Sequence, residues 1–407
     1  MTSPRQQHVL FLSFPMYGHV FPSLTIAEEL GRRGYRVTYA TGTDFAGHVR
    51  RAGVDLHRYP EELASIPARV DGVPDTNEVT LTCLTFVEQS LHTLAPHTFG
   101  RTIDRPDLVV CDPLTFHASV VLLSDVWKGV PLVTAHANVA CNETFNWPAK
   151  HRQLLLDDPV RGERAIEVET NIVRLMTEHG VDEDRMHRGD DVTLVYVPRA
   201  LQPAEESFGD TYAFVGPCTD GSVFDGEWQR TDERPVLFIS LGTLYNQRPD
   251  HFRRLLDVFG ELDWRVVVTT GGSTELSGPI PSNVELHPWV PQLAVLREAT
   301  IFLTNGGLGG ITSALQQAVP LVLMPEAAEQ EMHSEQVAAL GLGRIVRFAD
   351  TTPEELRTAV LEVAADELTR ARVRQMASLI REAGGTRRAA DVIENLLARS
   401  AASPLSV

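Results

Sequence analysis

The sequence has few cysteines, and they do not stand in a metal-binding or redox pattern. The four are spread along the chain at Cys83, Cys111, Cys141 and Cys218. No C-x-x-C pair and no Cys/His cluster with zinc-site spacing occurs. We therefore expect a reduced, cytoplasmic protein with no structural zinc.

Long apolar runs and an excess of positive charge are also missing. The apolar run near the N-terminus is short and ends at Pro15, so it predicts neither a signal peptide nor a membrane span. The formal net charge of the 407 residues is −18. This charge argues against nucleic acid or an anionic membrane as partner, because both attract basic surfaces.

Signature motifs of several enzyme classes are absent as well. There is no Walker A motif and no G-x-S-x-G, and the first strand leads into PMYGHVFP rather than G-x-G-x-x-G. A D-x-D string occurs at Asp182–Asp184, within the charged stretch VDEDRMHRGDD. We interpret this string as a solvated charge run rather than a metal-assisted sugar-nucleotide site.

What the sequence does contain is a repeated alternation of strand-like and helix-like segments. In the first half we predict strands at 8–14, 36–41, 54–57, 107–112, 131–136 and 192–201. We predict helices at 20–34, at 44–52, from the end of the 107–112 strand to about Lys128, and across 150–190. The pattern restarts with PVLFISLG, followed by strands in WRVVVTTG, NVELHPWV, TIFLTNGG and PLVLMPEA and by amphipathic helices over 353–400. Such alternation predicts parallel sheets with right-handed crossovers.

The length and the restart together predict two α/β domains, since 407 residues are too many for one hydrophobic core. We place the first domain at 1–215, a Gly-, Asp- and Pro-rich linker at 216–234 and the second domain at 235–384. Ligands of open α/β sheets bind beyond the carboxyl ends of the strands. A cleft between the two domains is therefore the expected site.

Two polar residues follow predicted strands of the first domain. His19 lies in the turn that leads into the first helix, and Asp112 ends the strand DLVVCD. An aspartate beside this histidine would fix its tautomer and stabilise the imidazolium formed when it takes up a proton. Spacing alone leaves the alternative open that each residue merely caps a helix.

A glycine-rich turn is the most specific feature of the second half. In TIFLTNGGLGGITSAL, a strand runs into Gly306, Gly307, Gly309 and Gly310 at the start of a helix. Glycines allow close backbone approach, and a helix amino end attracts anions, so this turn suits a diphosphate. The alternative is a tight turn whose glycines serve packing alone.

Further polar and aromatic residues stand at strand–helix junctions of the second half. Trp289 and Gln292 lie in HPWVPQLAVL, where an exposed indole could stack on a nucleotide base. The pair Glu329–Gln330 follows PLVLMPEA and could bind sugar hydroxyls. Taken singly, a core tryptophan and a solvated helix start are the more ordinary interpretations.

Taken in order, these motifs resemble the family 1 glycosyltransferases of the GT-B fold, in particular the bacterial macrolide glycosyltransferases. The resemblance covers the whole chain, from GHVFPSLTIAEELGRRGYRVTYAT through WVPQLAVLREA to EAGGTRRAADVIE. It implies two facing Rossmann-like domains and a C-terminal helix, 385–407, that crosses back to the first. It also implies inverting, metal-independent sugar transfer with His19 as general base and Asp112 as its partner.

The resemblance further implies a donor site for a UDP- or TDP-sugar as co-substrate, with no cofactor. Its residues would be Ser240, Thr243, Trp289, Val290, Gln292, Asn305, Gly307, Gly309, Gly310, Glu329 and Gln330. Three positions depart from the family pattern: Asn305 replaces a histidine, Ile311 a serine or threonine, and Ser313 an acid. These changes leave two other hypotheses beside a glycosyltransferase, namely a non-enzymatic scaffold protein and an enzyme with an atypical donor.

The acceptor side is less specific. Loops expected at 60–90 and 137–150 contain Phe86, Asn138 and Phe145, a mixture that suits an apolar pocket with a few polar contacts. The expected partner is a small lipophilic natural product, such as a macrolide, polyketide or phenolic compound of antibiotic biosynthesis. We expect a monomer or homodimer.

Overall fold

The computed structural model describes residues 5–63, 76–93, 102–115, 127, 129–180, 191–243, 248–271 and 276–402. Within this range the chain divides into two compact units. The N-terminal unit runs to Val223 and resumes at Ala383, and the C-terminal unit is Phe224–Glu382 together with Thr76 among the described residues of the first half. The boundary at Val223 falls inside the stretch 216–234 that the sequence predicts as a linker.

The N-terminal unit is built on a seven-stranded, wholly parallel sheet. Its strands are β1 (His8–Leu12), β2 (Arg36–Thr41), β3 (Asp55–Arg58), β4 (Leu108–Cys111), β5 (Leu132–His136), β6 (Val192–Val195) and β7 (Tyr212–Phe214). The order across the sheet is β3-β2-β1-β4-β5-β6-β7. The order reverses between β1 and β4, and open α/β sheets place their ligands at such a switch point.

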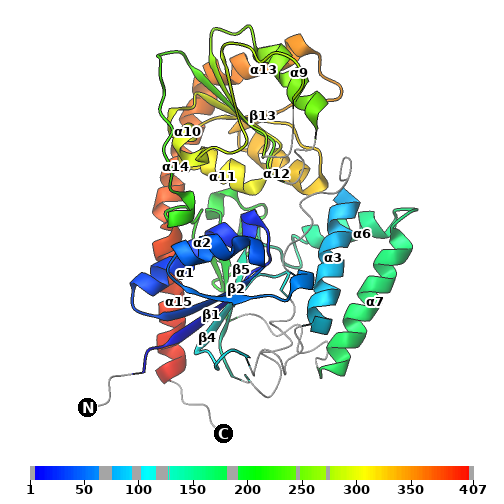
Figure 1. Ribbon diagram of the computed structural model, residues 1–407, viewed down its shortest axis with the longest axis vertical. Coiled ribbons are helices and arrows are strands. Elements are labelled where there is room, and N and C mark those ends of the chain that lie inside the picture. The colour runs from blue at the N-terminus through cyan, green and yellow to red at the C-terminus, as the bar shows by residue number, and fades with distance from the viewer. Residues whose placement is uncertain are drawn as a thin grey trace. The chain divides into compact units, whose positions relative to one another are not determined.

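Helices flank this sheet (Figure 1). They are α1 (Tyr17–Arg32), α2 (Ala46–Arg51), α3 (Thr76–Thr93), α6 (Trp147–Leu156), α7 (Gly162–Glu178) and α15 (Gly385–Ala402). α6 and α7 stand on the far side of α3 from the sheet (Figure 1). α7 packs beside α3, where Val87 and Leu91 meet Val168 and Ile172 in one apolar cluster. Asn171 Nδ2 donates to Glu88 Oε1 at 2.7 Å across the same contact.

The last helix, α15, packs against α1, so the chain ends in the N-terminal unit (Figure 1). Its inward residues Ala389, Ala390 and Ile393 are fully buried. Arg33 Nη1, just after α1, donates to Asp391 Oδ1 at 2.7 Å and also pairs with Glu394. Apolar burial and this ion-pair cluster therefore hold the C-terminal segment on the first unit.

The C-terminal unit repeats the design with a six-stranded parallel sheet. Its strands are β8 (Val236–Ser240), β9 (Arg265–Thr269), β10 (Val284–His287), β11 (Ile301–Thr304), β12 (Leu321–Leu323) and β13 (Gly343–Ile345), in the order β10-β9-β8-β11-β12-β13. The helices are α9 (Pro249–Phe259), α10 (Gln292–Glu298), α11 (Leu308–Gln316), α12 (Ala328–Ala339), α13 (Pro353–Ala365) and α14 (Glu367–Ala383). Here the switch point lies between β8 and β11.

The predicted class, two α/β units with parallel sheets, is confirmed, and most differences lie at element ends. β6 stops at Val195, short of the predicted 201, because Pro198 has no N–H for a ladder and a 3₁₀ turn, Arg199–Leu201, follows. The sequence did not predict β7 and β13, which have three residues each and lie at sheet edges. The expected loop 60–90 was wrong over 76–90, which belongs to α3.

Some expectations lie outside the described residues. They are the charge run with Asp182–Asp184 and most of the helix predicted before Lys128. In the part of the chain that is described, no helix is long and apolar enough to cross a membrane. The same residues contain no group of three or more His, Cys, Asp and Glu side chains that could hold a metal ion.

Candidate active site

His19 and Asp112 meet at the switch point of the N-terminal sheet. β1 and β4 are neighbours, with Leu12 opposite Cys111, so the residues that follow both strands emerge at one edge. His19 lies in the first turn of α1, and its Nδ1 is 2.6 Å from Asp112 Oδ2. Asp112 is 6% exposed and His19 22%. The structure thus joins a shielded carboxylate to a more accessible imidazole.

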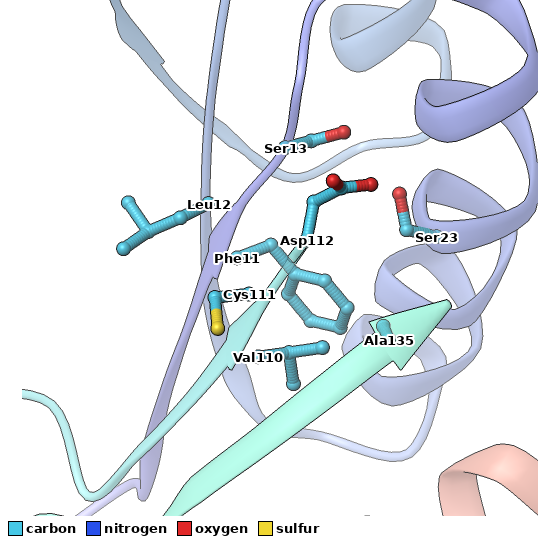
Figure 2. A pocket seen from close by; sticks show the side chains of 8 residues that line it. All are labelled: Phe11, Leu12, Ser13, Ser23, Val110, Cys111, Asp112 and Ala135. Atoms are coloured by element: carbon cyan, nitrogen blue, oxygen red, sulfur yellow. The ribbon is translucent and has the colours of Figure 1, made fainter. Parts of the chain in front are cut away.

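Local contacts fix the direction of the carboxylate. Leu114 N donates to Asp112 Oδ1 at 2.9 Å, while the other oxygen faces His19. Figure 2 shows the Asp112 side chain between Ser13 and Ser23, at a small cavity of about 10 Å³. That volume holds about one water molecule.

The backbone of His19 and Val20 accepts from two buried hydroxyl groups, those of Ser23 and Tyr39. Ser23 Oγ donates to the carbonyl of His19 at 2.7 Å and lies 2.7 Å from the Tyr39 hydroxyl. Burial raises the pKa of Tyr39, so this phenol stays protonated. These two residues did not stand out in the sequence, because the contact joins a helix to the second strand.

Buried aromatic rings pack next to His19. The ring centroid of Phe14 lies 5.3 Å from that of His19 and 4.8 Å from that of Phe86, both in edge-to-face geometry. Phe86, expected at an acceptor surface, is 4% exposed and belongs to the hydrophobic core. It therefore packs against the Phe14 ring within the core.

The other two expected acceptor residues lie in the segment after β5 and are half-buried. Asn138 Oδ1 accepts from Val139 N at 2.7 Å. The backbone N of Phe145 donates to Asn142 Oδ1 at 2.8 Å, which fixes the bend of this segment. Both contacts are local, so they shape the segment after β5 rather than the pair of His19 and Asp112.

His136 is a further residue at this edge, and the sequence motifs did not single it out. It is the last residue of β5, the strand beside β4, and it is half-buried. Burial lowers the pKa of His136 to about 4, the nearby His19 adds to the lowering, and the Asp112 carboxylate opposes it. Its place at a strand's carboxyl end was a usable signal in the sequence PLVTAH.

In the C-terminal unit, the glycine turn follows β11 at the second switch point. Thr304, the last residue of β11, is paired with Ser240, the last residue of β8. The loop that contains Thr243 therefore leaves β8 beside the glycine turn. Gly306 has φ +85°, and a Cβ there would come within 2.5 Å of Ser334 Oγ. Gly307 caps α11, whose first turn holds Gly309 and Gly310. The start of α11 is suited to binding an anion, because the N–H groups of its first turn and the positive end of the helix dipole lie there.

Asn305 uses both ends of its amide within the protein. Nδ2 donates to the Leu241 carbonyl at 2.7 Å, and Oδ1 accepts from Gly307 N at 3.2 Å. The side chain is 4% exposed. Ile311 and Ser313, the other two departures from the family pattern, are buried on α11. In this unit Asn305 thus joins the loop after β8 to the glycine turn.

The remaining expected donor residues spread along the same edge. Trp289, beyond β10, is 53% exposed, while Val290 and Gln292 are half-buried. Glu329 at the start of α12 is exposed, and Gln330 is buried with its Oε1 accepting from Glu326 N at 3.0 Å. Along the sheet edge the order is therefore the indole, Ser240, the glycine turn and then the acid–amide pair.

Comparison with known proteins gives a consistent family. Residues 253–398 match the family described as erythromycin biosynthesis protein CIII-like, C-terminal domain. The chain is 34% identical to demethyllactenocin mycarosyltransferase of Streptomyces fradiae, over 98% of this chain and 88% of that protein. It is 32% identical to oleandomycin glycosyltransferase of Streptomyces antibioticus, over 97% and 91%. With NDP-glycosyltransferase YjiC of Bacillus subtilis (strain 168) the identity is 31%, over 98% and 99%.

Solved structures of glycosyltransferases support the same family. The glycotransferase of kitacinnamycin superposes with a TM-score of 0.82 at 33% identity, covering 96% of this chain and 99% of that one. CalG4, the calicheamicin glycosyltransferase, gives a TM-score of 0.81 at 32% identity, covering 98% and 100%. The GT-B class predicted from the sequence is thereby confirmed, and the chain belongs to the GT-B glycosyltransferase family that includes these macrolide and other natural-product enzymes.

Proposed function

We propose that this chain is an inverting, metal-independent glycosyltransferase that moves a sugar from a UDP- or TDP-sugar to a hydroxyl of a small lipophilic natural product. The acceptor would be a macrolide, polyketide or phenolic compound. The observation that carries the proposal is the 2.6 Å contact between His19 Nδ1 and Asp112 Oδ2 at a sheet switch point. The name NDP-glycosyltransferase, borne by a relative 31% identical to this chain, supports the donor class.

In the proposed reaction, His19 is the general base. When its Nδ1–H donates to Asp112, the lone pair lies on Nε2, which takes the proton of the acceptor hydroxyl. Asp112 then stabilises the imidazolium by a charge-assisted hydrogen bond. The position of Asp112, almost fully shielded from solvent, strengthens this attraction.

The acceptor oxygen forms a bond to the anomeric carbon while the bond from that carbon to the diphosphate oxygen breaks. The nucleoside diphosphate leaves with the electron pair of the broken bond. A single displacement from the opposite side inverts the configuration at that carbon. The start of α11, with the glycine turn, would stabilise the charge that develops on the diphosphate.

A second candidate, a non-enzymatic auxiliary protein, is favoured by the state of the donor-side residues. The amide of Asn305 is engaged by the protein itself, and Ile311 and Ser313 are buried, so these positions supply no charged contact to a nucleotide. An enzyme would have to bind the diphosphate through backbone N–H groups instead. The third possibility, an atypical donor, shares this feature.

The testing experiment measures sugar transfer from UDP- and TDP-sugars to a panel of polyketide and phenolic acceptors. We expect the wild type to form product and His19→Ala to lose roughly 10²–10⁴ in kcat, the usual contribution of a general base. Asp112→Asn should lose a similar factor, because the asparagine cannot stabilise an imidazolium. His92→Ala, which removes an exposed histidine at the end of α3, is the matched control and should keep full activity.

Full turnover by His19→Ala would show that the assigned base is wrong. Isothermal calorimetry with UDP and TDP separates the candidates further. Micromolar binding would contradict the auxiliary-protein alternative, whereas no binding and no transfer would contradict the proposed enzyme. His19→Ala should bind the nucleotide as tightly as the wild type, since His19 lies in the other unit.

A further inference from the structure

His136 ends β5, the strand next to the two strands, β1 and β4, that lead to the proposed catalytic pair of His19 and Asp112. β4 lies between β1 and β5, and Cys111 is paired with Thr134. Asp112 and His136 therefore both emerge at the carboxyl edge, from strands about 4.8 Å apart. The strand that carries His136, β5, lies on one side of β4, and the strand that leads to His19, β1, lies on the other.

The face of the sheet on which His136 lies also carries two buried aromatic rings, those of Phe14 and Phe86. Cys111 Sγ and Thr134 Oγ1 are 4.0 Å apart on one face of the sheet. Because side chains alternate along a strand, His136 shares the face of Thr134. Phe14 and Phe86 belong to the hydrophobic cluster of that same face, together with Cys111. The Phe14 ring is itself fully buried, so the strand order, and not an aromatic surface, is what places His136 beside Asp112 and near His19.

Within the described part of the chain, the imidazole of His136 makes no hydrogen bond to another protein group. The side chain is half-buried, so it keeps some accessible surface. A buried or half-buried polar group without a protein partner costs free energy unless water or a ligand bonds to it. This state differs from that of His19, whose Nδ1 is held by Asp112.

His136 is unsuited to be the base itself. Its pKa is lowered to about 4, with burial as the largest cause, so the imidazole is neutral above about pH 5. The charged or titratable groups that act on it are Asp112 and His19. So weak a base is poorly matched to proton transfer near neutral pH. A neutral imidazole instead offers one N–H donor and one nitrogen acceptor to a ligand.

We propose that His136 binds a second oxygen of the acceptor, next to the hydroxyl that His19 deprotonates, and that the protein therefore selects acceptors with two neighbouring oxygens. This inference rests on the proposed glycosyl transfer. The substrate class comprises 1,2- and 1,3-diols, hydroxyketones and ortho-dihydroxyaryl compounds. His136 touches the substrate but takes no part in the proton transfer.

The experiment compares two acceptors with the same carbon skeleton, an ortho-dihydroxyaryl compound and its monohydroxy analogue. For the wild type we expect kcat/KM to be about tenfold higher with the dihydroxy compound, the effect of one good hydrogen bond. His136→Leu should lower the dihydroxy value by about tenfold and leave the monohydroxy value within twofold. His136→Asn, which keeps a donor and an acceptor, should restore most of the preference.

His57→Leu is the matched control, since His57 is a half-buried histidine of β3 whose pKa is also lowered by burial. It should keep both activities. The pH profile of kcat/KM between pH 5.5 and 8 should be the same for the wild type and for His136→Leu, because His136 does not change protonation there.

Three results would overturn the proposal. They are an equal loss with both acceptors in His136→Leu, an unchanged preference in that variant, or a pH profile of its kcat/KM that differs from that of the wild type between pH 5.5 and 8. Failure of the sugar transfer itself is recognised separately, because the wild type would then turn over neither acceptor. In that case the role of His136 is decided by measuring the Kd of the same two acceptors without donor. Tryptophan fluorescence gives this value for the wild type and for His136→Leu.

Discussion

At the scale of single residues, Asn305 shows how a position in a binding motif can serve the fold. Its amide nitrogen donates to the carbonyl that follows β8, and its oxygen accepts from the N–H at the cap of α11. The side chain thus joins the two strands of the switch point through the loops that follow them. A histidine in the same place, as in the family pattern, would need different space around a site that is 4% exposed here.

This arrangement predicts a clear order of stability among Asn305 variants. In Asn305→Asp, a carboxylate oxygen would face the Leu241 carbonyl, so we expect the free energy of unfolding to fall by roughly 2–4 kcal/mol. Asn305→Ala removes both hydrogen bonds without the repulsion and should lose about 1–3 kcal/mol. Urea unfolding measures both values. An Asn305→Asp protein as stable as the wild type would contradict the orientation of the amide.

At the scale of elements, the last helix, α15, packs in the N-terminal unit although it follows the C-terminal unit in sequence. It begins at a pair of glycines with positive φ, Gly384 and Gly385, and Gly385 N donates to Val215 O at 2.7 Å. The helix then buries a row of alanine, isoleucine and leucine side chains in the N-terminal unit. The last helix therefore stabilises the first unit although it is far from that unit in sequence.

Truncation of a buried side chain in this helix should be costly. Ile393 is fully buried, so Ile393→Ala should lower the free energy of unfolding by about 2–5 kcal/mol through lost burial and the cavity left behind. Leu368→Ala in α14 is the control, since Leu368 is 57% exposed and its truncation should cost under about 0.5 kcal/mol. Equal losses in the two variants, measured by denaturant unfolding, would mean that α15 is not docked as described.

At the scale of the whole molecule, the charge of −18 has to be reconciled with the anionic donor that we propose. A nucleoside diphosphate gains nothing from the overall field of such a protein. Its binding must then depend on local groups, and the start of α11 with its glycine turn is the suited place in the described part of the C-terminal unit. The relatives assign the fold and the enzyme class, whereas nucleotide binding remains part of our proposal.

Thermal unfolding tests this directly. A nucleoside diphosphate at a hundred times its Kd should stabilise the folded protein by about 2.7 kcal/mol, which raises the Tm by roughly 5 °C or more. UDP and TDP should both be tried, with uridine and thymidine as controls that lack the phosphates. The nucleosides should give much smaller shifts. Equal shifts with nucleoside and diphosphate would contradict an anion site at α11.

The amino-acid sequence by itself determined the succession of strands and helices and placed His19, Asp112 and the glycine turn after strands. Such features depend on local periodicity and on turn residues, which can be recognised within a short stretch of sequence. The same local view misjudged Phe86, because 76–90 was expected to be a loop, and it missed the short edge strands. Their stability comes from neighbours distant in the sequence.

Tertiary structure alone decided which strand ends stand together. The pairing of β1 with β4 brings His19 to Asp112 across 93 positions, and the pairing of β4 with β5 adds His136. It also decided that the amide of Asn305 is used within the protein. Strand order depends on how whole faces pack against helices, a long-range balance that no local pattern encodes.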